Sequence, residues 1–186
     1  MITALIVAAV VLVLLFVFVI GIYNALVRLR NQVDNSWSQI DVQLKRRHDL
    51  IPNLVETAKG YMKHERGTFE AITQARAQAM GAKTVSDASK AEGALGEALS
   101  KFMLVVENYP DLKANQNFLS VQEELSSTEN RIAFARQSYN DQVLSFNNKI
   151  QMFPSNIVAG TFAFGKRDFF EIEVAAEREV PKVSFQ

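Results

Sequence analysis

The chain has 186 residues and carries 20 basic and 20 acidic side chains, so its formal net charge at neutral pH is zero. This balance leaves no overall field to attract nucleic acid, and we expect no nucleic-acid partner. The absence of cysteine excludes disulfides, thiolate catalysis and cysteine-ligated metal centres.

The first 27 residues contain no charged side chain. At about 1.5 Å per residue, the Ala, Val, Leu, Ile and Phe run from Ala4 to Ile22 forms a helix of roughly 30 Å, which is the thickness of a hydrocarbon core. Tyr23 follows in the place of an interfacial aromatic residue. A cleaved signal peptide would need a basic start, a shorter apolar region and a small-residue cleavage site. Residues 1–27 therefore predict an uncleaved transmembrane anchor, with the lipid bilayer as its partner.

Basic residues close to a membrane span favour the cytoplasmic side. Arg28 and Arg30 flank the C-terminal end of the apolar run, and Lys45, Arg46 and Arg47 follow. Only the α-amino group is cationic at the other end. We therefore expect a single-pass protein with its N-terminus outside and the rest of the chain in the cytoplasm.

Beyond the anchor, apolar residues recur at helical spacing from Leu26 to Ile72. The mean step is close to the turn of a straight helix, which favours a face directed at a bundle core over a long coiled coil. Glycine and proline are absent between Tyr23 and Ile51. The spanning helix is therefore expected to continue into the domain as one rod, bent only at Pro52, which lacks a backbone donor.

A second helix is predicted after the polar loop at residues 81–87. Ser89 and Glu92 have the spacing of a capping box at its start, and Pro110 ends it. A Tyr-Pro-Asp turn at residues 109–111 implies an antiparallel neighbour.

The third predicted helix has the cleanest apolar stripe, from Phe118 to Phe153, and Pro154 ends it. At about 1.5 Å per residue the three helices span roughly 80, 36 and 60 Å, so they cannot cover one another fully. Either Pro52 bends the first helix, or apolar surface is left for another chain to cover. The second alternative predicts a homo-oligomer.

After Pro154, residues 155–160 are expected to form one short helix, and residues 171–186 an extended tail. The segment that follows Pro154 is rich in phenylalanine. Packing in the core or between subunits is the default interpretation of such a segment. A second contact with the membrane is the other interpretation. The candidate oligomer contacts are Phe153, Phe162, Phe164, Phe169 and Phe170.

His48 lies on the apolar stripe of the first helix. It is either a titratable or metal-binding group, or a polar residue at a helix kink that bonds a freed carbonyl or Thr128. A second histidine in ligand register is missing, and no catalytic set is recognisable, so we expect no enzymatic activity, no metal and no cofactor. His48, Asp49, Pro52 and Asn53 are instead a candidate kink site for a partner.

The basic run at residues 45–47 predicts a solvated helix face that pairs with Asp41 and Asp49. Glu124 and Glu129 on the third helix predict a solvated face of the same kind.

Five stretches of the chain resemble hallmark segments of the bacterial LemA family. They are NSWSQIDVQLKRRHDLIPNLV (35–55), YPDLKAN (109–115), STENRIAFAR (127–136), QMFPSN (151–156) and REVPKVSF (178–185). The resemblance implies a short N-terminal anchor, an up-and-down helical bundle in the cytoplasm and a location in the bacterial inner membrane. It brings no established catalytic residues. Magnetosome membrane proteins include a relative of this kind.

The sequence thus predicts an all-α protein in which a transmembrane helix continues into an up-and-down antiparallel bundle of three to four helices. The predicted parts are an anchor (1–27), a bundle domain (28–154) and a Phe-rich segment with an extended tail (155–186). The leading functional hypothesis is a non-enzymatic, self-associating scaffold that organises other membrane or cytoplasmic proteins. The alternative is an accessory binding subunit of a membrane protease or envelope-stress sensor.

Overall fold

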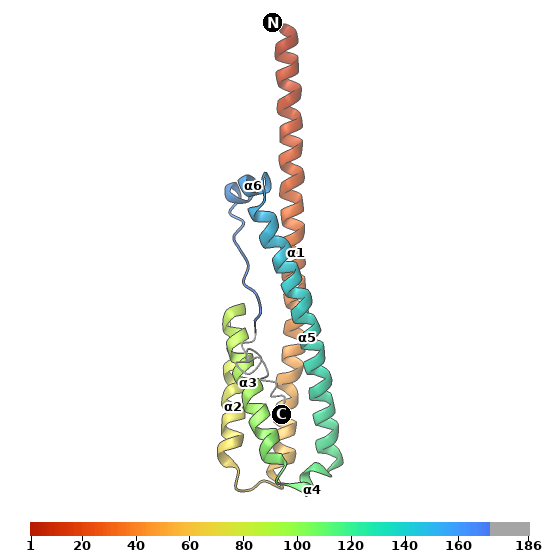
Figure 1. The fold of residues 1–186 in the computed structure, drawn as a ribbon, viewed down its shortest axis with the longest axis vertical. Helices are drawn as coiled ribbons and strands as arrows, with labels where there is room; N and C mark the ends of the chain where they lie inside the picture. The colour runs from red at the N-terminus through yellow and green to blue at the C-terminus, as the bar shows by residue number, and fades with distance from the viewer. Residues whose placement is uncertain (172–186) are drawn as a thin grey trace, which may run out of the picture. The chain divides into compact units, whose positions relative to one another are not determined.

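The computed structural model describes residues 1–171, which form six α-helices and no strand. The helices are α1 (Ile2–Lys59), α2 (Arg66–Met80), α3 (Val85–Val106), α4 (Pro110–Lys113), α5 (Gln116–Gln151) and α6 (Ser155–Thr161) (Figure 1). These elements confirm the predicted all-α fold with a long apolar N-terminal helix. The predicted extended tail falls on residues 172–186, which lie outside the described residues.

The chain divides into two compact units. Unit 1 comprises Met1–Ile40 and Ala135–Asp168, and unit 2 comprises Asp41–Phe134 and the residues from Phe169 onward. Both long helices, α1 and α5, contribute residues to each unit. Each unit therefore combines segments that are distant in the sequence but pack together. The predicted parts, with boundaries at residues 27 and 154, are instead continuous segments of the chain.

In unit 1, α1 packs against the second half of α5 and against α6 (Figure 1). Their buried faces recur every three, four or seven residues, which is the spacing of one helical face. The buried apolar residues are Ile22, Leu26, Val33 and Ile40 of α1, Tyr139, Val143, Phe146 and Ile150 of α5, and Val158 and Ala159 of α6. Residues 1–20 are exposed along their whole length.

The exposed part of α1 is long and apolar enough to cross a membrane. Exposure of a run of Val, Leu, Ile and Phe to water would be strongly unfavourable, because each buried side chain of this size gains about 1.5–3 kcal/mol. A hydrocarbon environment removes this cost. Length and exposure thus agree with the predicted anchor.

In unit 2, the last part of α1, α2, α3 and the first part of α5 run alternately up and down (Figure 1). Their facing sides form one apolar core. Its fully buried members include Leu54, Met62 and Ile72, together with Leu95, Phe102 and Phe118. The rings of Phe69, Phe102 and Phe118 stack in series, with centroids 6.2 and 6.4 Å apart.

The prediction of one rod from Leu26 to Ile72 is wrong at its C-terminal end. α1 is uninterrupted through Pro52 but ends at Lys59, and a turn at residues 60–65 leads into α2. The amides of Tyr61 and Met62 both bond the Ala58 carbonyl, at 3.0 Å. The chain therefore reverses at this turn rather than at the proline, and α2 packs back in unit 2.

The predicted capping box of the second long helix is also wrong in position. α3 begins one turn earlier, with Thr84 as its N-cap. The Asp87 amide donates to Thr84 Oγ1 at 3.0 Å, which is the N-cap hydrogen bond, and the Thr84 hydroxyl donates to Asp87 Oδ2 at 2.8 Å. Ser89 and Glu92 lie inside the helix and are buried.

The third long helix agrees with its prediction more closely. Pro110 opens the one-turn helix α4 at the predicted turn, and α5 then carries the expected stripe. The stripe is buried from Phe118 to Ile150, but Phe153 is 79% exposed. The short helix predicted at residues 155–160 is confirmed as α6.

Candidate functional site

Two ionisable residues of α1 are buried in unit 2. Arg47 is 4% exposed and His48 7% exposed. Both lie on the apolar face, because positions 44, 47, 48 and 51 share one side of a helix and Leu44 and Ile51 are buried there. The predicted solvated face for residues 45–47 is therefore wrong for Arg47.

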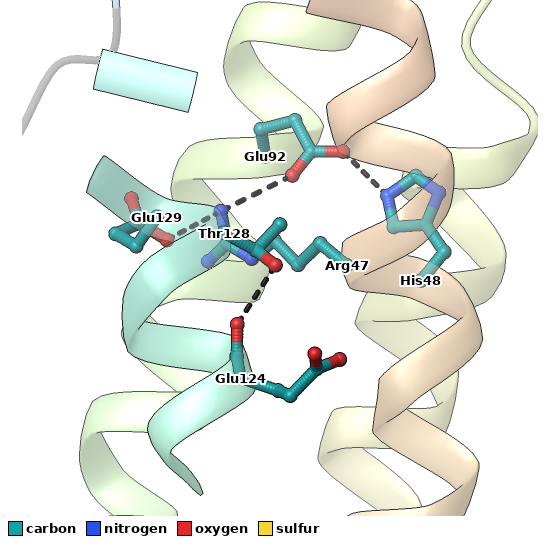
Figure 2. Close-up of polar contacts among 6 residues, drawn as sticks. All are labelled: Arg47, His48, Glu92, Glu124, Thr128 and Glu129. Carbon is teal, nitrogen blue, oxygen red and sulfur yellow. Dashed lines mark hydrogen bonds and ion pairs between the residues drawn. The ribbon is translucent and has the colours of Figure 1, made fainter. Parts of the chain in front are cut away.

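Glu92 of α3 is the partner of both residues, and its side chain is 1% exposed. His48 Nε2 lies 2.6 Å from Glu92 Oε1, and Arg47 Nη1 lies 3.4 Å from Glu92 Oε2 (Figure 2). Because the guanidinium is cationic, Glu92 is the acceptor in both contacts, and His48 Nε2 donates. We call Arg47, His48 and Glu92 the buried cluster.

Arg47 has a second carboxylate partner on a third helix. Glu129 of α5 lies 3.1 Å from Arg47 Nη1, and its side chain is 53% exposed. Figure 2 shows the guanidinium between Glu92 and Glu129. The buried cluster thus joins α1, α3 and α5, and it approaches solvent on the side of Glu129.

The arginine packs against the backbone of α3. A Cβ added at Gly96 would lie 3.6 Å from Arg47 Nη2, which is an ordinary van der Waals distance. The guanidinium therefore lies close to the α3 backbone one turn after Glu92.

Beside the cluster, a second set of polar contacts links α1 and α5. Arg46 Nη2 lies 2.8 Å from Glu124 Oε1, with both side chains nearly half exposed. Thr128, which is buried, donates its hydroxyl to the Glu124 carbonyl at 2.8 Å. Thr128 therefore satisfies itself within α5 and is not the partner of His48, contrary to one predicted alternative.

Pro52 leaves the His48 carbonyl without its helical donor, because proline has no N–H to bond the carbonyl four residues earlier. Arg76 of α2 supplies the missing donor: its Nε lies 2.7 Å from the His48 oxygen. The freed carbonyl is thus bonded by a neighbouring helix and not by the imidazole. This contact fixes α2 against α1 at the proline.

The predicted kink site does not stay together. His48 is buried, whereas Asp49, Pro52 and Asn53 are exposed on the other side of α1. The backbone of His48 links the two sides: its carbonyl has no helical donor at Pro52 and accepts a hydrogen bond from Arg76 instead.

The chemistry of the buried cluster is that of a satisfied ion network. General acid–base catalysis requires a group within reach of a substrate, but each of the three side chains is buried and engaged by another. Within residues 1–171, no group of three or more His, Cys, Asp or Glu side chains could hold a metal ion. Such a network fixes how helices pack, since any shift would strand a buried charge.

A groove of about 710 Å³ lies elsewhere in unit 2, between the end of α1 and α2. Apolar side chains that include Val55, Met62 and Phe69 line it, and Lys59, Lys63 and Arg66 bring positive charge to it. Arg66 and Lys59 pair with acids of their own helices, at 2.7 and 2.5 Å. Glu70 also lines the groove, so its walls are apolar and its rim carries charges of both signs.

The five phenylalanines predicted as oligomer contacts lie in different surroundings. Phe170 is fully buried in unit 2 and presents no surface to a second copy. Phe164 is half-buried in unit 1 against Tyr23 and Phe146. Phe153 and Phe162 are 79% and 51% exposed, and Phe169 is 38% exposed.

Sequence reasoning missed Glu92 and Arg76 as functional partners. Glu92 stands on the stripe Ala88, Glu92, Leu95 and Phe102, so an acid at an apolar position was the available signal. Arg76 carried no signal, because its partner is a carbonyl on another helix.

Comparisons with known proteins place the chain among related sequences. Protein LemA of Metamycoplasma hominis is 29% identical over 184 residues, which is 92% of this chain and 80% of the relative. Magnetosome protein MamQ 2 of Paramagnetospirillum magneticum is 24% identical, covering 85% of this chain and 68% of the relative. Magnetosome protein MamQ of Magnetospirillum gryphiswaldense is 23% identical over the same shares. The model of the LemA family matches residues 36–185, and the chain therefore belongs to the LemA family.

Proposed function

We propose that this protein is a non-enzymatic scaffold, anchored in the bacterial inner membrane, that self-associates and presents its helical bundle to other proteins. One observation carries the proposal: the same uninterrupted helix, α1, contains the apolar segment and the residues of the buried cluster. Because one helix contributes to both, the apolar segment and the bundle core are joined without a flexible linker.

The state of the ionisable residues supports a scaffold over an enzyme. The buried cluster holds three helices together and leaves no reactive group facing a cavity of its own. The relatives named LemA and MamQ carry no activity in their names. A bundle whose helices are held together by buried ion pairs suits a protein that acts by presenting a surface to other proteins.

Self-association is supported by large apolar side chains exposed on unit 2. Phe134 of α5 is 74% exposed, Leu104 of α3 71% and Val42 of α1 62%. Each of these residues is a candidate contact between copies, and Phe134 offers the largest apolar side chain of the three.

In-membrane crosslinking tests self-association directly, because the chain contains no cysteine. A Phe134→Cys variant treated with a bismaleimide in native membranes should give a covalent dimer. Ser100→Cys, at an exposed polar position of α3, is the matched control and should give much less. Protein that stays monomeric in detergent at all working concentrations, with no Phe134→Cys dimer in membranes, would contradict the proposal.

We further propose the orientation with the N-terminus outside and unit 2 in the cytoplasm, on the basis of Arg28 and Arg30 beside the apolar run. The same Ser100→Cys variant tests it. A membrane-impermeant maleimide should label position 100 only after permeabilisation. Labelling in intact cells would indicate the opposite orientation.

A second candidate function, an accessory binding subunit of a membrane protease or envelope-stress sensor, is favoured by the groove between α1 and α2. Pro52 and Arg76 set how α2 lies against α1, and α2 forms one wall of the groove. A Pro52→Ala variant restores an N–H to α1, which competes with Arg76 for the His48 carbonyl. Partner capture should weaken while the bundle stays folded. Crosslinking that returns the same partners from this variant would refute this second function.

A further inference from the structure

Unit 1 carries an apolar patch at the junction of α5 and α6. Four large side chains there are exposed: Met152 by 59%, Phe153 by 79%, Ile157 by 61% and Phe162 by 51%. They fall within eleven positions, and the intervening Val158 and Ala159 are buried against unit 1. These four exposed residues, here called the α6 patch, lie on α6 (Ile157) and just before and after it (Met152, Phe153 and Phe162), and their apolar surface is uncovered in water.

The α6 patch lies beside the end of the apolar segment of α1. The Tyr23 ring is 4.8 Å from the Phe162 ring and 5.8 Å from the Phe164 ring, measured between centroids. Tyr23 immediately follows the run of residues that is long and apolar enough to span a membrane. Tyrosine at this place belongs at the headgroup level of a bilayer, and its contacts bring the α6 patch to the same level.

Basic residues predominate in the sequence around the α6 patch. Residues 1–33 and 142–167 contain no Asp or Glu, and their charged side chains are Arg28, Arg30, Lys149, Lys166 and Arg167. Asp34, Asp141 and Asp168 border these stretches, and Arg167 pairs with Asp34 at 2.9 Å. Exposed apolar side chains in a segment that also carries Lys and Arg are typical of a segment that lies in the interface of an anionic membrane.

We propose that the α6 patch inserts into the headgroup and outer acyl region of the bilayer that α1 spans, with the surrounding Lys and Arg side chains on anionic lipid headgroups. The protein thus contacts the membrane twice: through α1, which crosses it, and through the α5–α6 junction, which lies on its surface. The patch is continuous with the place where α1 leaves the membrane, and this decides for lipid over a second copy of the chain. Phe153 and Phe162 are then lipid contacts and not oligomer contacts.

Spin labels on single cysteines in the full-length protein test this placement. Phe153→Cys and Ile157→Cys probe the patch, and Ser100→Cys is the control, because Ser100 is an exposed residue of unit 2 that belongs to no proposed contact. All three positions are exposed, so the labels leave the core intact; Met152→Cys is the substitute if one patch variant misfolds. The protein is reconstituted in vesicles of phosphatidylcholine and phosphatidylglycerol at a ratio of about 7:3, in which phosphatidylglycerol supplies the anionic headgroups.

Collisions with oxygen, which partitions into lipid, are compared with collisions with a water-soluble nickel chelate. The patch labels should collide more with oxygen than with nickel, by several-fold relative to the label at position 100. Equal, water-like accessibility at positions 100, 153 and 157 would overturn the proposal. Short label-to-label distances at position 153, which vanish on dilution with unlabelled protein, would also overturn it, since they place a second copy on the patch.

The role of the basic residues has its own readout. In vesicles of phosphatidylcholine alone, the label at position 153 should become more accessible to nickel, because the headgroup attraction is lost. The double variant Lys149→Gln/Lys166→Gln should show the same change in the anionic vesicles. Unchanged accessibility in both experiments would refute the assignment of these cations to lipid headgroups. The proposal stands apart from self-association, which the Phe134→Cys crosslink decides.

Discussion

Replacing Glu92 by glutamine tests the buried cluster most directly. The substitution keeps the size of the side chain but removes the charge that faces Arg47 and replaces one of the two carboxylate oxygens with an amide donor. Arg47 would retain only Glu129, at 3.1 Å and half exposed. Breaking a buried pair from one side costs about 3–5 kcal/mol, and the surviving contact places the expected loss near the lower value, about 3 kcal/mol.

The assay is urea unfolding of the full-length protein in mild detergent, followed by circular dichroism at 222 nm. A loss of about 3 kcal/mol also lowers Tm by about 6–12 °C for a chain of this size. Glu97→Gln is the matched control on the same helix, because Glu97 pairs with Lys101 at 2.8 Å with both side chains about 70% exposed. It should leave the urea midpoint almost unchanged, because solvent screens an exposed ion pair.

The double variant Arg47→Met/Glu92→Leu separates the value of the pair from the cost of a stranded charge. Since it leaves no buried ion, it should lose less than about 1 kcal/mol, or gain stability. A Glu92→Gln loss no larger than that of Glu97→Gln would refute the reasoning. The reasoning would also be refuted if the double variant lost as much stability as the Arg47→Met and Glu92→Leu single variants together.

Three further predictions concern contacts that the sequence did not reveal. Arg76→Met should cost about 1–3 kcal/mol, because it leaves the His48 carbonyl unpaired, but much less in a Pro52→Ala background; equal urea-midpoint shifts in both backgrounds would contradict this. Asn147→Ala removes two hydrogen bonds of 2.9 Å to the backbone after α6, so trypsin should cut there several-fold faster than in the parent chain; unchanged cleavage would count against the role of Asn147. Burial raises the pKa of the Tyr139 phenol, so the folded state holds this proton more tightly than the unfolded state. Stability is then lost as pH rises above about 10, and Tyr139→Phe should flatten that loss in urea titrations at alkaline pH.

The helices could be predicted because their apolar stripes are regular. The stripe of α5 alone located the buried residues from Phe118 to Ile150. The turn after α1 could not be found in the same way, because Met62 follows Ala58 at helical spacing and is buried although the helix has ended. Gly60 was the available signal, and a single glycine near a stripe that continues is weak.

The start of α3 shows a limit of capping motifs. Thr84 and Asp87, like Ser89 and Glu92, match the pattern of a hydroxyl residue followed by an acid three positions later. The choice between them depends on which acid finds a partner across the bundle. Glu92 has one in Arg47 and His48, which are more than forty residues away along the chain.

For the candidate site, the sequence identified His48 but not what holds it. Local patterns report which face of a helix is apolar, and they placed His48 on that face correctly. They assigned Arg47 to solvent because it follows two other cations, although its register with Leu44 and Ile51 indicates burial. Runs of charge therefore need to be divided by helical face before they are interpreted.

The argument for self-association also changes with the structure. Unequal helix lengths suggested that apolar stripe was left over for a second chain, but the surplus of α1 and α5 is covered within unit 1, where Val33, Tyr139 and Phe146 are buried. Length alone thus no longer requires a partner. If the α6 patch lies in the bilayer, Phe153 is not available to a second copy either. The exposed apolar residues of unit 2 are then the contacts between copies that we propose, and for this reason the crosslink is placed at Phe134.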